Sequence, residues 1–363
     1  MGAPRNVARR VRLAATLAVP VVLGACNQDQ PLSGSAPPPA TLPSFTIKDL
    51  GLLPGGTQAQ ANAGTNSLIV GWASDAAGAH HAVKFVAGNA APLTEPASTD
   101  SSEARGISST GMIAGVAYSS GTSLALLWTS STAAPIVLPT LGGTNASARA
   151  VNAAGVVHGW SEDAKVDTVP VFWGANHSVQ VVDTALHAGD PTALNDSGFA
   201  AGNTPNSGYF WTPAGGLTEV QTIGLDEDVN GLNNTGIVVG RFLTNDSLNR
   251  AFRWTDVRGM VRLGEPPAGY SQLAGGSVND QYLVAATASN VNASGNITAS
   301  VVAITTALET LRQFAALPTL GGAQASASDG GMTPCGTIVG WALPSGSPSR
   351  HAVAWIPTGC TVP

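Results

Sequence analysis

Short apolar runs, each closed by a small residue, recur along the chain at intervals of about 44 residues. The closing glycines are Gly71, Gly115, Gly159, Gly202, Gly240 and Gly340. Ala285 or Ala286 takes the same place in a further unit. A polar loop and then an aromatic residue follow each glycine, and these aromatic residues are Phe85, Trp128, Trp173, Trp211, Trp254 and Trp355. The pattern indicates a chain built from one repeated unit.

The pattern of apolar and polar residues in each unit predicts four short antiparallel strands. In one unit the apolar and alternating stretches are residues 148–151, 156–160, 169–173 and 179–182. The turn Asn152-Ala153-Ala154-Gly155 joins the first two, and similar turns begin at Asn195 and Asn233. Asn tolerates left-handed backbone and Gly removes its steric cost, so these turns predict hairpins.

Four strands in a unit of this length predict an all-β fold, a β-propeller with seven blades, whereas β-solenoids repeat at closer to 20 residues. Six or eight blades remain open, because the sixth unit lacks Trp and carries a polar insert, Ser289–Ser300. The last unit ends soon after Trp355 and has no fourth strand. We expect residues 45–50 to supply that strand, which would close the ring and hide two sheet edges.

The first strands carry small residues at one equivalent position, each followed by an apolar residue. The small residues are Gly106, Ala150, Ala193 and Gly231. Because successive side chains of a strand point to opposite faces, this pattern predicts close packing on one face of each blade near the axis.

Three sequence elements of the repeat resemble the family of extracellular HAF repeats. They are the Asn-x-x-Gly turn, a His-Ala-Phe-like strand and a closing Leu-Pro-Thr-Leu-Gly-Gly segment. The strand occurs as residues 81–83, 250–252 and 351–353, and the closing segment as residues 138–143 and 317–322. The resemblance covers nearly all of the chain after its first segment. It implies a repeat fold outside the cytoplasm, and it carries no settled activity and no catalytic residues.

The first residues form an export signal. Four arginines precede an apolar run, residues 13–23, which is too short to span a bilayer comfortably. Leu23-Gly24-Ala25-Cys26 matches the bacterial lipobox, so we expect cleavage before Cys26 and lipidation of its thiol. This divides the chain into a signal peptide (1–25), a proline- and serine-rich tether (26–44) and one propeller domain (45–363). Asn27 favours the outer membrane in an organism that has one.

Loss of residues 1–25 leaves 12 basic and 22 acidic residues, a formal net charge of −10. Such a surface disfavours nucleic acid and anionic lipid as partners. We therefore expect contact with the membrane through the lipid anchor alone, and a monomer. Charged residues make up only 10% of the chain, so small and hydroxyl side chains must cover much of the ring.

Two cysteines remain besides Cys26. Cys335 precedes the turn glycine of the last unit, and Cys360 lies just beyond its third strand. These two connections leave a propeller blade on the same face, which predicts a disulfide in an oxidising compartment. Free or metal-binding cysteines are the alternative.

The chain contains no Gly-x-Ser-x-Gly elbow, no phosphate-binding loop and no His-Glu-x-x-His. We accordingly predict no catalytic residue, no cofactor and no metal site, and we interpret the six histidines as structural. Two groups are weak binding candidates. Arg105 and Arg149 hold equivalent axial positions and could bind an anion. Asp226, Asp228 and Asn230 could bind a ligand or Ca²⁺, although the spacing does not fit an EF-hand.

These observations favour a non-enzymatic binding or scaffolding lipoprotein that engages an envelope protein or a glycan through one propeller face. The candidate loops are Ser161–Thr168, Asp226–Asn230, Arg241–Asn249 and Ser289–Ser300. The alternative is a propeller hydrolase or lyase acting on an extracellular carbohydrate or lactone, and a purely structural role is a third possibility.

Overall fold

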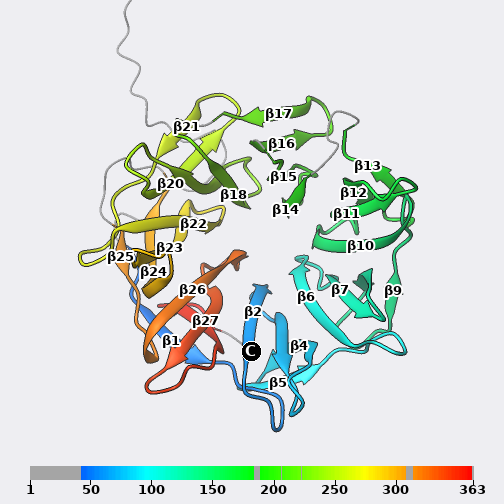
Figure 1. Ribbon diagram of the computed structural model, residues 1–363, viewed down its shortest axis with the longest axis horizontal. Helices are drawn as coiled ribbons and strands as arrows, with labels where there is room; N and C mark the ends of the chain where they lie inside the picture. Colours follow the sequence, from blue (N-terminus) through cyan, green and yellow to red (C-terminus); the bar gives the residue numbers. More distant parts are fainter. Residues whose placement is uncertain (1–41, 184–188, 206, 222, 308–313, 362–363) are drawn as a thin grey trace, which may run out of the picture.

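The computed structural model describes residues 42–361 except 184–188, 206, 222 and 308–313, and these residues form seven four-stranded antiparallel sheets in a ring (Figure 1). The predicted all-β, seven-bladed propeller is confirmed. The predicted signal peptide, Cys26 and most of the tether lie outside the described residues.

The strands of each blade follow the chain from the axis outward, except in blade 7. Blades 1 to 3 are β2 Ala59–Gly64, β3 Ile69–Ser74, β4 His80–Val86, β5 Asn89–Pro92; β6 Ser101–Ile107, β7 Ile113–Ser119, β8 Thr122–Trp128, β9 Pro135–Val137; β10 Gly142–Val151, β11 Val157–Asp163, β12 Thr168–Trp173, β13 Val179–Val181. Blades 4 to 7 are β14 Asp190–Leu194, β15 Ala200–Asn203, β16 Gly208–Thr212, β17 Gly216–Val220; β18 Glu227–Leu232, β19 Val238–Leu243, β20 Asn249–Thr255, β21 Gly259–Arg262; β22 Gln272–Val278, β23 Leu283–Val291, β24 Ile297–Thr306, β25 Ala315–Ala316; β26 Gly321–Met332, β27 Ile338–Pro344, β28 His351–Pro357, β1 Phe45–Asp49.

The N-terminal strand closes the ring, as predicted. β1 is the outermost strand of blade 7 and pairs antiparallel with β28 from Phe45↔Pro357 to Asp49↔Val353. The amide of Leu50 extends this ladder by donating to the Ala352 carbonyl at 2.9 Å. The first and the last described strands therefore belong to one sheet, and β28 has no open edge.

The repeated glycine and tryptophan have separate structural reasons. A β-carbon on Gly159 would lie 2.1 Å from the Ser147 carbonyl oxygen of the adjacent first strand, so no larger residue fits there. Trp173 is fully buried, and its indole N–H donates to the Pro139 carbonyl at 2.7 Å. Trp128 and Trp355 make the same bond to the incoming connection of their own blades, through Thr94 and Pro318. The indole thus fixes the incoming connection in these three blades.

The turns between first and second strands form a hydrogen-bonded ladder on one face of the ring. Asn152, Asn195 and Asn233 each donate through Nδ2 to the carbonyl of the equivalent Asn in the next blade, at 3.3, 2.8 and 3.1 Å. The Asn152 side-chain oxygen also accepts two amides of its own turn. We call this the base face and the opposite one the mouth face.

Some predicted boundaries were wrong at the mouth face. β10 begins at Gly142, because the Leu-Gly-Gly segment forms the start of a first strand. Strand ends also occupy much of the candidate loops, so that residues 164–167, 244–248 and 292–296 alone connect the strands there. Asp226 precedes β18, which contains Asp228 and Asn230.

The disulfide between Cys335 and Cys360 is present, with Cα atoms 6.1 Å apart. It ties the base-face turn of blade 7 to the segment that follows β28. The Cys335 amide also donates to Asn66 Oδ1 of blade 1 at 3.1 Å. The bridge therefore fixes a turn of blade 7 that contacts blade 1. In the part of the chain described, no helix is long and apolar enough to cross a membrane.

Candidate functional site

Each first strand lines the axis and carries a bulge at the same place. In six blades one residue of the first strand has no paired residue in the second strand. These unpaired residues are Asn62, Arg105, Arg149, Thr192, Asn230 and Gly276. A bulge residue has no partner in the ladder, and it re-aims its side chain. Arg105 and Arg149 thus hold equivalent positions, as predicted, and each is the bulge residue of its strand.

The period-two alternation around these bulges arranges the axial side chains in three levels. The mouth level holds Gln60, Glu103, Ser147, Asp190, Asp228, Ala274 and Ser326. The bulge residues form the middle level. The base level, two residues further on, consists of Gly64, Ile107, Val151, Leu194, Leu232, Val278 and Met332, which all line a cavity of about 170 Å³. The axis is therefore polar toward the mouth and apolar toward the base.

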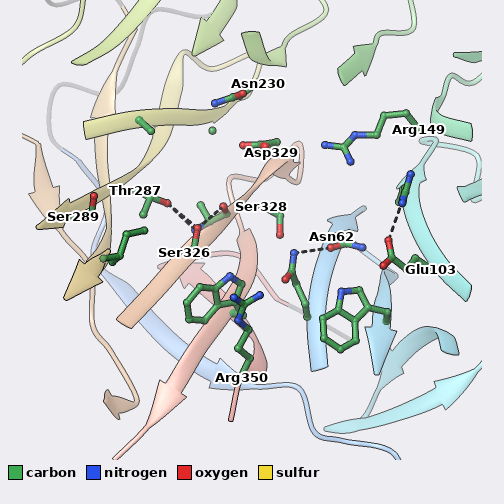
Figure 2. Close-up of a pocket in the computed structure, with 18 of the residues that line it drawn as sticks. Asn62, Glu103, Arg149, Asn230, Thr287, Ser289, Ser326, Ser328, Asp329 and Arg350 are labelled. Atoms are coloured by element: carbon green, nitrogen blue, oxygen red, sulfur yellow. Dashed lines mark hydrogen bonds and ion pairs between the residues drawn. The ribbon is translucent and has the colours of Figure 1, made fainter. Parts of the chain in front are cut away.

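A pocket of about 630 Å³ opens on the mouth side of the axis (Figure 2). This volume lies within the range of small-molecule sites, roughly 300–1,000 Å³. Most lining side chains carry hydroxyl, amide or charged groups, including Asn62, Ser289, Thr287 and Ser326. The pocket brings together three of the candidate residues, Arg105, Arg149 and Asn230.

The two candidate arginines differ in their surroundings. Arg105 donates to Glu103 at 3.1 Å, to Ser147 Oγ at 2.7 Å and to Tyr118 Oη at 3.1 Å. Arg149 donates to no side chain or carbonyl within the described residues. Glu103 neutralises Arg105, so Arg149 alone keeps its five donors available to a ligand.

The acidic candidates are engaged with protein groups. Arg241 forms ion pairs with Asp228 and, at 3.9 Å, with Asp226. Asn230 donates to the Gly275 carbonyl of the next blade at 2.9 Å, as Asn62 donates to Ala104 at 2.8 Å. Among the described residues, no group of three or more His, Cys, Asp or Glu side chains is placed to hold a metal ion. Asn230 still lines the pocket, whereas Asp226 and Asp228 do not.

Asp329 is a pocket residue that the sequence pattern did not indicate. Blade 7 skips four residues, Ser328–Gly331, between the pairs Ala327↔Gly340 and Met332↔Ile338, where other blades skip one. The longer bulge carries Asp329 into the axis, opposite Arg149 (Figure 2). The surrounding ring of protein raises the pKa of Asp329 to about 6; Asp228 and Asp190 add to this rise, and Arg149 opposes it. Water in the open channel still reaches this carboxyl group.

Two tryptophans form one side of the pocket. Trp72 and Trp341 directly follow the repeat glycines of blades 1 and 7, which are neighbours in the ring. Trp72 stacks on His80, with ring centroids 3.7 Å apart. The guanidinium of Arg350 lies 4.4 Å from the centre of the Trp341 ring, a cation–π contact. Trp160 holds the same repeat position in blade 3 and does not line the pocket.

Three of the described histidines form hydrogen bonds with protein groups outside the pocket. His81 lies within 3.3 Å of Asp75 and 3.1 Å of Glu95, and the bonds to these carboxylates raise its pKa against the opposing effect of burial. His158 is completely buried and lies 3.0 Å from both the Val171 carbonyl and Tyr209 Oη. Burial lowers its pKa to about 4, so the ring is neutral near pH 7. His351 lies 2.7 Å from Asp49. His187 lies outside the described residues.

No family model matches the chain, and no curated protein matches it. The fold is similar to that of solved propellers. One is YCF48 bound to D1 peptide, with a TM-score of 0.52, 10% identity, and coverage of 88% of this chain and 97% of the other. Another is the GH74 xyloglucanase from Xanthomonas campestris, with a TM-score of 0.50 and 11% identity, covering 82% of this chain and 52% of the enzyme. At such identities the likeness extends to the fold alone.

Proposed function

We propose that this chain is an envelope-anchored binding protein that takes a glycan in the axial pocket of its mouth face. The observation that carries the proposal is the pocket's composition, a wide polar cavity beside two indole rings. Hydroxyl and amide groups match the donors and acceptors of a sugar. Indole faces attract the C–H hydrogens of a pyranose ring, because the face of an aromatic ring is electron-rich.

A glycan fits this pocket better than a protein surface does. Protein interfaces place an apolar, aromatic core at their centre and polar groups at their rim. Here most lining residues are polar, and the two tryptophans come from the neighbouring blades 1 and 7. The acidic balance of the mature chain supports the expectation that nucleic acid is not the ligand.

One observation favours the alternative, a hydrolase or lyase acting on carbohydrate. A carboxyl group with a raised pKa in a pocket is a frequent mark of catalysis, and Asp329 is such a group. Glycoside hydrolysis commonly uses two carboxyl groups, and the other pocket carboxylate, Glu103, is held by Arg105. We therefore favour binding without turnover.

The test is a glycan array probed with the purified full-length protein. Trp341→Ala should abolish most of the signal, because this ring lines the pocket and is partly exposed. Trp72→Ala should lower the signal less, because Trp72 is buried and one face of its ring stacks on His80. Trp160→Ala is the matched control, because it removes the same repeat residue away from the pocket. An array without signal, or equal loss in all three variants, would contradict the proposal. Release of bound sugar as a changed product would favour the enzyme instead.

The proposed location of the protein at the membrane is tested separately. Lipidation of Cys26 should place the protein in the membrane fraction, and Cys26→Ala should move it to the soluble fraction. Incorporation of labelled fatty acid into the wild-type protein alone would support the anchor. An unlabelled wild-type protein would rule it out.

A further inference from the structure

The floor of the axial pocket holds two charged side chains that the protein leaves available. Glu103 pairs with Arg105 and Asp228 with Arg241, so these four groups neutralise each other. Arg149 and Asp329 make no hydrogen bond or ion pair with any described residue. They face each other across the axis (Figure 2).

The long bulge of blade 7 is the reason for this arrangement. Ser328 makes the contact that a bulge residue makes elsewhere in the ring, since its Oγ donates to the Ala61 carbonyl of blade 1 at 2.6 Å. Asp329 and the two glycines after it are additional to that pattern. The insertion therefore leaves the contact between blades intact and adds a carboxylate to the channel.

The lining of the channel changes from polar to apolar directly below this pair. Arg149 and Asp329 also line a smaller cavity of about 100 Å³, whose lining includes the apolar residues Ile107, Val151 and Leu194. The same three apolar residues line the base cavity of about 170 Å³. The polar pocket of about 630 Å³ at the mouth therefore gives way to an apolar level toward the base. A glycan that enters from the mouth must stop there, because passage would strip its hydroxyl groups of hydrogen bonds.

We propose that Arg149 and Asp329 hold the terminal residue of an uncharged glycan, which enters chain end first and presents two neighbouring hydroxyl groups to this pair. This inference rests on the glycan-binding function proposed above. A guanidinium only donates hydrogen bonds and a carboxylate only accepts them, whereas each hydroxyl does both. An anionic group would meet Asp329, and a cationic group would meet Arg149. A neutral diol satisfies both side chains.

The test uses neutral oligosaccharides of the type that the array identifies, measured by titration calorimetry. Each is compared with a copy whose terminal hydroxyl groups are O-methylated and with the free terminal monosaccharide as competitor. We expect methylation to weaken binding at least tenfold and the monosaccharide to compete. Asp329→Asn and Arg149→Gln should each weaken binding tenfold or more, because hydrogen bonds to charged groups are the strong ones.

Asp256→Asn is the matched control, since Asp256 is exposed in a turn of blade 5 away from the pocket. Thermal unfolding of each variant establishes that the fold is retained, and Arg149→Lys tests whether a charge without the planar fork suffices. Glycan binding that tolerates methylated ends, or that is unchanged in both floor variants, would overturn the inference and leave the proposed function standing. Loss of all binding in the wild-type protein would overturn both. Tighter binding of uronate-terminated than of neutral chains would also overturn the neutral-diol inference.

Discussion

The two ends of the central channel are built from the same strands and differ in how strictly they repeat. At the base, equivalent asparagines link blades 3 to 6, and the axial level is apolar in six of the seven blades and glycine in the seventh. At the mouth, the equivalent positions hold glutamine, glutamate, serine, aspartate or alanine. The base repeats one kind of side chain in most blades, and the mouth differs from blade to blade.

This difference separates the groups that hold the ring together from those that face a ligand. A repeated residue makes the same contact in several blades, as the indoles of blades 2, 3 and 7 do with the incoming connections. A position that varies is free of that common contact, as with Arg149 and Asp329. Substitutions at repeated positions should therefore lower stability, and substitutions at the mouth should lower affinity.

The largest effect should come from Trp173→Ala. The side chain is fully buried and its N–H bonds to Pro139, so truncation should lower the free energy of unfolding by about 3–5 kcal/mol. Urea unfolding followed by fluorescence gives this value. At temperatures where the variant is folded, its glycan affinity should match the wild type. A decrease in the free energy of unfolding of less than about 1 kcal/mol would contradict the role of this indole in stabilising the ring.

Acid should weaken the contact between blades 3 and 4 through His158. Its pKa is about 4 in the folded protein and 6.5 in a free histidine, so the unfolded chain binds the proton first. Stability is lost as the pH falls from 6.5 through 4, by roughly 3 kcal/mol in all. His158→Gln should show a smaller loss over the same range in thermal unfolding. Equal slopes for both proteins would contradict this assignment.

The asparagine ladder can be tested with a matched pair. Asn152→Ala removes two turn bonds and the Nδ2 donation to the Asn195 carbonyl, whereas Asn279→Ala removes two equivalent turn bonds and no donation, because its own Nδ2 has no partner among the described residues. We expect Asn152→Ala to cost about 1 kcal/mol more in urea unfolding. Equal costs would show that the ladder between blades contributes nothing.

The smallest stability effect should be that of Asp329→Asn. Because the folded pKa of Asp329 is raised from 3.8 to about 6, the folded state binds its proton first. The wild type should lose stability as the pH rises from about 4 to 6, opposite to the effect of His158, and the variant should lack this component. The surrounding charges are Arg149, Asp228 and Asp190. Melting temperatures across this range give the comparison, and identical curves would contradict it.

The regular repeat is the reason that the fold could be predicted from the sequence. Part of the site could not be predicted, because it lies where one blade departs from the repeat. Regular spacing of Gly159 and Trp173 predicted blades, and the unpaired last unit predicted the closing strand at Phe45. The equivalent position of Arg149 in the repeat predicts its place on the axis, but the sequence does not show its surroundings. Asp329 was missed because an insertion moves it out of the repeat alignment, and the ion pair of Asp228 with Arg241 joins two strands whose register the sequence does not show.

The central claim is that ligand binds at the mouth and ends at the blade 7 bulge. Hydrogen exchange measured by mass spectrometry, with and without a glycan selected on the array, tests it directly. The account predicts slower exchange in residues 326–332 and around Trp341, with no change at the turns beginning at Asn152, Asn195 and Asn233. Protection at those base turns, or bound glycan without protection at the bulge, would contradict it.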